Sequence, residues 1–226
     1  VELLSQVNSF VDGFSKVDHY VHTRHEPKKQ RQLVTLGAVE RLTTSAILKQ
    51  LIYFFDFKSS DNSYGYQVNP GFKDRYIFKP WLNLWVEFVS GISLVIDDVA
   101  NENFYVVKAD ISKFYDEVPH EPIKRLLLGG VNQKIDVKLA TLDPDSMRRY
   151  HKIIDILFQV NSALSPPGTG RGLPQGPAYA RFLAELYLDN IDSVFEQTLK
   201  SGEVLFYRRY VDDVFIICRS ESEAKD

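Results

Sequence analysis

The sequence predicts an α+β fold, and two observations support this prediction. Apolar residues recur at helical spacing between residues 40 and 55, so that one face holds Leu42, Ala46, Ile47, Leu51 and Phe54. β-Branched and aromatic residues form short runs at 104–107, 204–207 and 214–218, which is typical of strands. No internal repeat or low-complexity tract occurs in the 226 residues.

Three helices are expected in the first half of the chain, at 1–14, 40–55 and 73–95. Pro80 lies inside the third helix and indicates either its true start or a kink, because proline lacks an N–H. The acidic pair at 97–98 has no strand before it. We therefore expect this pair to form the turn from the third helix into the next strand.

The second half begins with a strand at 104–107, which its apolar residues predict to be buried. A short helix is then expected at 119–128. A longer helix is expected from Pro144 to about residue 160, with Asp143 as its N-cap. A further amphipathic helix is expected at 178–188, after a loop rich in glycine and proline.

Two adjacent carboxylates, Asp212 and Asp213, lie between the strands expected at 204–207 and 214–218. Like charges at this distance repel, and each raises the pKa of the other unless a cation lies between them. Oxygen ligands of this kind suit Mg²⁺. The alternative interpretation is an ordinary Asp-Asp hairpin turn without a ligand.

A third carboxylate, Asp110, follows the strand at 104–107. The carboxyl end of a strand presents its side chains to a crevice in an open sheet. Together with Asp212 and Asp213, Asp110 could hold two Mg²⁺ ions from two neighbouring strand ends. Such a pair activates an attacking 3′-hydroxyl and neutralises a leaving pyrophosphate, which is most of what phosphoryl transfer requires.

The segment 172–176 reads Gly-Leu-Pro-Gln-Gly and leads into the helix expected at 178–188. Free N–H groups at such a turn suit a phosphate or the edge of a base. Taken alone, the segment is equally explained as a common loop-to-helix signal.

These segments together resemble motifs A, B and C of reverse transcriptases, in the order of that family: Asp110 with Phe114-Tyr115, then 172–176, then Tyr210-Val211-Asp212-Asp213. The resemblance implies right-handed polymerase fingers and palm, with an antiparallel palm sheet backed by helices. It implies mainly fingers in 1–98 and palm in 99–226, with a fingers-side helical insertion at about 119–160. We expect the thumb to be missing from this chain.

The resemblance also implies the roles of the acidic residues. Asp110 and Asp212 would be the principal ligands of two Mg²⁺ ions, with Mn²⁺ as an alternative metal. Asp213 would be a supporting catalytic carboxylate, and Ile111 would contribute its backbone carbonyl to the metal site.

The basic segment at 28–36 resembles the fingers segment that binds the incoming triphosphate. Arg31 is expected on the triphosphate, with Lys28 beside it, and Lys29 and Arg24 are alternatives to Lys28. Without the resemblance, a solvated basic loop explains these lysines equally well.

Tyr115 matches the family position that excludes a ribose 2′-hydroxyl, and Gln175 matches the residue that lies against the templating base and the incoming nucleotide. Gly176, Arg181 and Tyr210 are expected to contact nucleic acid. The alternative for Tyr115 is a core aromatic residue in a chain with 13% aromatic residues.

The amino-acid sequence of the helix after 172–176 is most similar to that of abortive-infection and other defence-associated bacterial enzymes, and the segment 63–66 is similar to group II intron enzymes. Arg181 stands where intron-type enzymes usually carry proline. At helical spacing Arg181 could instead pair with Glu185.

The resemblance implies an RNA-directed DNA polymerase that takes an RNA template, a DNA or RNA primer and deoxynucleoside triphosphates. The alternatives are template-independent or protein-primed DNA synthesis in antiphage defence, and a catalytically silent palm that serves as a binding or assembly module. A homo-oligomer is expected from the resemblance alone. Tyr115 and the amino-acid sequence of 172–176 argue against an RNA-dependent RNA polymerase.

The formal net charge of −3 counts mildly against a nucleic-acid polymerase, because binding to phosphates favours a basic surface. Basic clusters occur, among them Arg208-Arg209, but such clusters are more often solvated faces. A single cysteine, Cys218, excludes a disulfide framework and a cysteine zinc site. We see no membrane span and no signal peptide, and we expect a cytoplasmic protein.

Overall fold

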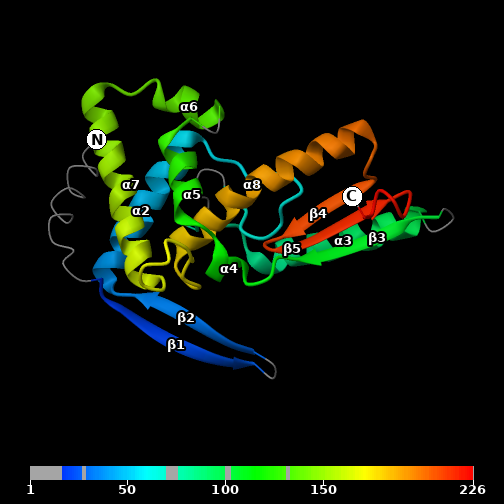
Figure 1. Ribbon diagram of the computed structural model, residues 1–226, viewed down its shortest axis with the longest axis horizontal. Coiled ribbons are helices and arrows are strands. Elements are labelled where there is room, and N and C mark those ends of the chain that lie inside the picture. The colour runs from blue at the N-terminus through cyan, green and yellow to red at the C-terminus, as the bar shows by residue number, and fades with distance from the viewer. Residues whose placement is uncertain (1–16, 27–28, 70–75, 100–102, 131–132, 226) are drawn as a thin grey trace. The chain divides into compact units, whose positions relative to one another are not determined.

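The computed structural model describes residues 17–26, 29–69, 76–99, 103–130 and 133–225 (Figure 1). It has the predicted α+β class, with antiparallel strands and long helices. The chain divides into two compact units, each built from separate stretches of sequence. The first unit comprises Val1–Phe57 with Tyr115–Leu183, and the second comprises Lys58–Phe114 with Ala184–Asp226.

In its described residues, the first unit combines a two-stranded antiparallel hairpin with four helices. The hairpin is the long ribbon of β1 (His19–Glu26) and β2 (Lys29–Leu36) in Figure 1. The helices are α2 (Ala38–Phe55), α5 (His120–Leu128), α6 (Gln133–Leu139) and α7 (Pro144–Leu164). Two further helices cross the boundary between the units: α4 (Phe114–Glu117) and α8 (Ala178–Ser201).

The core of the first unit lies between α2, α5 and α7. Its centre holds the apolar side chains Ile47, Leu48, Leu51, Ile123, Leu127, Ile154 and Leu157, all at most 2% exposed. The Tyr150 hydroxyl on α7 donates a hydrogen bond to the Leu127 carbonyl of α5 at 2.6 Å, which joins the two helices inside this core. α7 begins as the sequence predicted, because Asp143 accepts hydrogen bonds from the N–H groups of Asp145 and Ser146.

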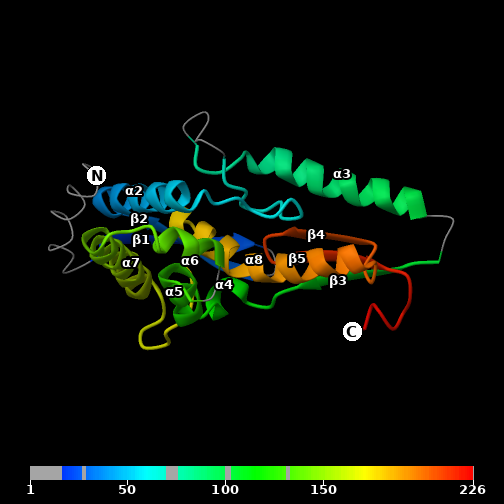
Figure 2. The same ribbon diagram turned by 90° about the horizontal axis from the view of Figure 1, so that it is seen from above.

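The second unit is a three-stranded antiparallel sheet with helices on both faces. The strands β3 (Tyr105–Asp110), β4 (Phe206–Tyr210) and β5 (Asp213–Cys218) are ordered β3-β5-β4. Phe195 of α8 stacks on Tyr207, with ring centroids 4.4 Å apart. Helix α3 (Trp81–Val99) covers the opposite face, where the ring centroids of Trp85 and Tyr210 lie 4.9 Å apart, and Figure 2 shows α3 running alongside β4.

Helix α3 differs from its prediction at both ends. It begins at Trp81, so Pro80 marks the start of the helix and not a kink, and residues 70–75 lie outside the described part of the chain. It ends at Val99, and the acidic pair 97–98 is therefore helical and not the predicted turn. No proline follows within the helix to stop it earlier. The helix predicted at 1–14 lies outside the described residues.

The prediction that the strand before Asp110 is buried is wrong. Five of the six residues of β3 are exposed, and only Val107 packs on the cluster of Tyr207, Val214, Ile216 and Cys218. β3 is an edge strand that pairs with β5 alone, and the aromatic side chains of α3 and α8, Trp85 and Phe195, pack on the other edge strand, β4. An apolar run cannot reveal whether its strand will lie at the edge or in the centre of a sheet.

Candidate active site

The two adjacent carboxylates lie at a tight hairpin between β4 and β5, in the predicted strand–turn–strand. Tyr210 pairs with Asp213, so that Val211 and Asp212 alone make the turn. Val211 has a φ of 56°, in the left-handed region that a β-branched residue rarely adopts. The turn that presents Asp212 is therefore conformationally strained.

Asp110 reaches the same end of the sheet from β3. It is the register partner of Asp213, and residues directly opposite in a pair of strands point to the same face. The next residue, Ile111, donates its N–H to the carbonyl of Asp212 at 3.4 Å. The structure thus brings all three predicted carboxylates and the backbone of Ile111 together at the ends of neighbouring strands.

The donor chemistry of this end of the sheet suits a hard divalent cation, although it does not form a complete cage. Among the described residues, no group of three or more His, Cys, Asp or Glu side chains is arranged to hold a metal ion. Mg²⁺ at phosphoryl-transfer sites usually takes only one or two carboxylates and completes its shell with water and substrate phosphates. Asp110 is exposed and Asp212 and Asp213 are half-buried, so the carboxylates are open to such partners.

The predicted nucleotide-binding residues belong to the first unit, where the backbone links them. The carbonyl of Tyr115 accepts a hydrogen bond from Leu173 at 2.7 Å, and the carbonyl of Gln175 accepts one from Val34 of β2 at 2.7 Å. The segment 172–176 is therefore held between α4 and the hairpin. Both Tyr115 and Gln175 are partly exposed.

Gly176 is required by the close approach of this segment to β2. A Cβ atom at this position would lie 2.3 Å from the carbonyl oxygen of Val34, and the φ of Gly176 is 129°. Only glycine fits both conditions. The structure thus accounts for Gly176 without nucleic acid, whose contact with this residue stays a prediction.

Arg31 is exposed on β2, where it is the register partner of Arg24 on β1. Lys28 lies outside the described residues, and only the backbone of Lys29 is described. Arg31 is three residues from Val34, the residue bonded to Gln175. Arg31 therefore lies on the same strand, β2, as the residue that bonds the loop 172–176.

The two other residues expected on nucleic acid differ in burial. Arg181 is exposed on α8. Tyr210 is half-buried against Trp85 and Phe88, and burial raises the pKa of its hydroxyl, with a smaller electrostatic contribution from Tyr66. Tyr210 is thus largely a packing residue of the sheet, and its contact with nucleic acid stays a prediction.

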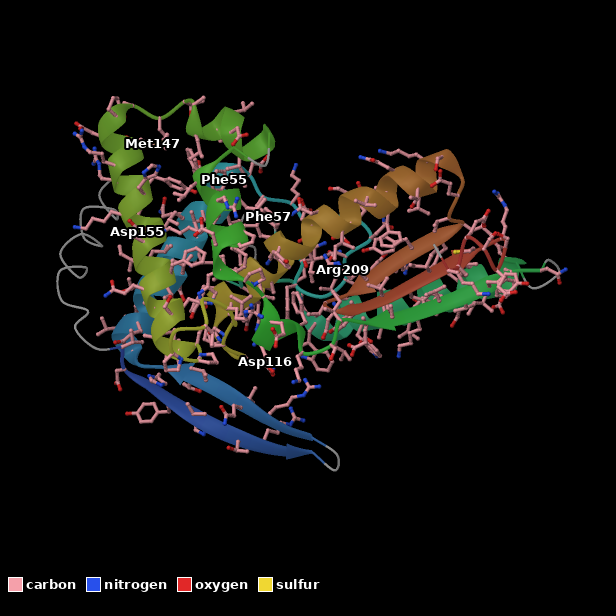
Figure 3. All side chains as sticks on the ribbon, in the orientation of Figure 1. Phe55, Phe57, Asp116, Met147, Asp155 and Arg209 are labelled. Atoms are coloured by element: carbon pink, nitrogen blue, oxygen red, sulfur yellow. The ribbon has the colours of Figure 1, made fainter. Side chains whose placement is uncertain are left out.

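The sequence did not reveal the role of Arg209, the residue of β4 next to the hairpin. Arg209 was expected in a solvated basic cluster, yet its side chain is completely buried. Its guanidinium binds both oxygens of Asp192, with Nε 2.8 Å from Oδ1, and binds Oε2 of Glu185 at 3.2 Å. Figure 3 shows Arg209 between α8 and β4. Two acidic residues seven positions apart on one helix face were the available signal.

The charges of this buried group are mutually stabilised. Burial alone would lower the pKa of Arg209, but the hydrogen bonds and charges of Asp192 and Glu185 outweigh it and hold that pKa above its ordinary value. Burial, together with the charge of Asp192, raises the pKa of the Tyr207 hydroxyl, which donates to Asp192 at 2.5 Å. The arginine therefore stays charged and the tyrosine stays neutral.

The segment 62–65 supports the same hairpin from the side. The carbonyl of Asn62 accepts a hydrogen bond from the N–H of Arg209, and the N–H of Tyr64 donates one to the carbonyl of Arg209, each at 2.8 Å. A Cβ atom on Gly65 would lie 2.6 Å from a methyl group of Val211 and 2.7 Å from its backbone nitrogen. The strained turn is thus enclosed by backbone.

The comparisons with known proteins agree with this geometry. Residues 16–226 match the family described as reverse transcriptase (RNA-dependent DNA polymerase). The chain therefore belongs to the reverse transcriptase family. No curated protein matches the chain.

Among solved structures, the chain is similar to apo telomerase from Candida tropicalis truncated from its C-terminal domain, with a TM-score of 0.53 at 12% identity. The match covers 99% of this chain and 49% of the telomerase chain, so this chain spans about half the length of that structure. A likeness at this identity establishes the fold and confirms the predicted fingers-and-palm type. Among the described residues, no helix is both long enough and apolar enough to cross a membrane.

Proposed function

We propose that this chain carries the catalytic centre of an RNA-directed DNA polymerase, which adds deoxynucleotides to the 3′-hydroxyl of a primer. The observation that supports the proposal most directly is the register of Asp110 with Asp213, with Asp212 on the adjoining turn. In a reverse transcriptase fold, carboxylates at this place are expected to bind catalytic metal. An RNA template, a DNA or RNA primer and deoxynucleoside triphosphates are the proposed partners.

In this mechanism Asp110 and Asp212 would hold two divalent cations, with Asp213 in support and the Ile111 carbonyl as a further oxygen donor. Mg²⁺ or Mn²⁺, when bound, supplies Lewis acidity at the primer hydroxyl and at the leaving pyrophosphate. The remaining contribution of the protein is positioning, since phosphoryl transfer requires little covalent chemistry from side chains.

The first unit would supply the nucleotide contacts. Arg31 would bind the triphosphate, with Lys28 nearby, and Gln175 would lie against the base. The ring of Tyr115 would occupy the space of a ribose 2′-hydroxyl and thereby select deoxynucleotides. The division of the chain into fingers at 1–98 and palm at 99–226 stays a prediction.

The deciding experiment is nucleotide incorporation by the full-length protein, with Mg²⁺ and labelled deoxynucleotides, with and without a primed RNA template. Asp212→Asn should abolish incorporation, because it removes a metal ligand and leaves the shape of the side chain. The matched control is Asp155→Asn, an exposed aspartate on α7 that pairs with Lys124 and should keep full activity.

Three outcomes separate the candidate functions. Incorporation that needs the template and disappears in Asp212→Asn supports the proposal. Incorporation that ignores the template and still disappears in the variant favours template-independent or protein-primed synthesis. No incorporation by the wild type under varied metals and primers favours a silent binding module.

Sugar selection is tested by Tyr115→Ala, which should admit ribonucleotides. The ratio of kcat/KM for deoxynucleotides over ribonucleotides should fall by about tenfold or more, equivalent to roughly 1.4 kcal/mol of discrimination. Tyr53→Ala is the control, since Tyr53 is a tyrosine 80% exposed on α2. An unchanged ratio in Tyr115→Ala would show that Tyr115 is only a packing residue.

A further inference from the structure

Arg209 is a fully matched hydrogen-bond donor inside the second unit. A guanidinium carries five N–H groups. The structure gives them Oδ1 and Oδ2 of Asp192, Oε2 of Glu185 twice, and the carbonyl of Val211 at 3.0 Å. The two acids and the arginine are each at most 1% exposed. The carboxylates of Asp192 and Glu185 therefore fix the guanidinium, which also binds the hairpin through the carbonyl of Val211.

The bond to Val211 involves the strained residue of the turn. A non-glycine residue in the left-handed region is strained and persists only where the surrounding structure enforces it. Two contacts enforce it here: Arg209 binds the Val211 carbonyl, and the Gly65 backbone closes on the other side of the residue. Asp212 follows directly, so the conformation of Val211 decides where the carboxylates of the hairpin lie.

We propose that Arg209 is a positioning residue for the carboxylate hairpin. By anchoring the Val211 carbonyl to Asp192 and Glu185, it holds the turn in the conformation that presents Asp212 and Asp213 for metal binding. The inference rests on the proposed function for its catalytic consequence, but the anchoring itself can be tested without activity.

Lysine cannot replace this arrangement. An ammonium has three donors and no planar fork, so it cannot bind Asp192 through two atoms and also reach Glu185 and Val211. Arg209→Lys therefore keeps the buried charge and removes the anchor. If Arg209 only neutralised the two acids, this exchange would alter stability and leave the hairpin as it is.

The experiment compares full-length wild type, Arg209→Lys and Tyr207→Phe. Tyr207→Phe is the matched control, because it removes a neighbouring bond to Asp192 without touching the guanidinium. Three quantities are measured at a temperature where all proteins are folded: hydrogen exchange of residues 206–218, Mn²⁺ affinity by titration, and nucleotide incorporation as a function of free Mg²⁺.

We expect Arg209→Lys to speed hydrogen exchange at the turn and to weaken Mn²⁺ binding by about tenfold or more, the usual effect of losing a group that orients a metal ligand. The Mg²⁺ concentration for half-maximal incorporation should rise in parallel. Tyr207→Phe should lower the unfolding temperature only. Wild-type exchange and Mn²⁺ affinity in Arg209→Lys would overturn the proposal.

A second variant keeps the test decisive if Arg209→Lys does not fold. Asp192→Asn preserves the shape of the side chain but removes one of the two acceptors of the guanidinium fork, and a smaller change in the same direction is expected. Failure of the proposed function is distinguishable: the wild type would then incorporate no nucleotide, while exchange at the turn would still respond to the anchor.

Discussion

Each unit fixes a loop of its candidate site with a buried polar cluster, but the two clusters use different chemistry. In the second unit, the ionic cluster of Arg209, Glu185 and Asp192 binds the hairpin carbonyl of Val211. In the first unit, a cluster without carboxylates converges on the carbonyl of Gly172, whose donors are His120 Nε2 at 2.7 Å, Ser165 Oγ at 2.8 Å and Asn161 Nδ2 at 3.2 Å.

The clusters also differ in how well their donors and acceptors match. The five N–H groups of Arg209 bind four different oxygens, whereas three donors share the single oxygen of Gly172. The buried Oδ1 of Asn161 has no hydrogen-bond partner among the described residues. Deleting one member of the ion cluster should cost more, because it leaves buried N–H or carboxylate groups of the other members without a hydrogen-bond partner. The shared carbonyl should tolerate the loss of one donor.

The largest effect should come from Asp192→Ala, which leaves the Arg209 fork without its main acceptor. Removing one partner of a buried ion pair costs about 3–5 kcal/mol. Chemical denaturation measures this loss. Asp155→Ala removes an exposed partner of Lys124 as the control, and should cost less than about 1 kcal/mol. Equal costs for the two variants would show that the buried cluster is not special.

A smaller effect is expected from Gly65→Ala, which tests the backbone wall of the hairpin. The added methyl would press on Val211, and overpacking of this kind costs about 1–3 kcal/mol. Nucleotide incorporation should fall together with stability. In the control Gly168→Ala, a Cβ meets no atom within 4 Å, although φ is 72°. That variant should lose some stability and keep its activity.

A weaker effect should follow from Asp143→Ala at the start of α7, the helix that carries Asn161. Loss of the N-cap should lower the unfolding temperature by about 2–4 °C, and Asp143→Asn should keep most of it. The hydrogen bonds from Ser146 lower the pKa of Asp143. The cap therefore stabilises fully above the unfolded-state pKa of about 3.9 and fades as the pH falls through the lower folded-state value.

Thermal melts between about pH 2 and pH 6 check this prediction, with the difference between wild type and Asp143→Ala shrinking as the pH falls. A difference that grows on acidification would contradict the sign of the shift.

The smallest effect is expected from Asn161→Leu, which sharpens the contrast with Asp192. It removes one of three donors to Gly172 and also the unmatched Oδ1, so stability should change by less than about 1 kcal/mol. Denaturation of the variant beside Ser165→Ala measures the change. A loss of several kcal/mol would mean that the first unit depends on its cluster as strongly as the second does.

Local signals determined much of this protein from the sequence alone. The spacing of apolar residues predicted α2, and the acceptor chemistry of Asp143 predicted the start of α7. The β-branched and aromatic runs predicted the two strands around Asp212 and Asp213, although the first strand runs on to Tyr210 and leaves only Val211 and Asp212 in the turn. The motif order predicted the family that the comparison confirmed.

Tertiary structure alone decided which of these residues are buried and which meet. Both β3 and β4 lie at a sheet edge, but the helix side chains Trp85 and Phe195 pack on β4, and β3 stays exposed. Arg209 is buried because β4 runs under Glu185 and Asp192, which lie 24 and 17 residues earlier in the chain. A sequence shows the charge of a side chain directly. The cost of burying that charge depends on partners that only the folded chain brings within hydrogen-bonding distance.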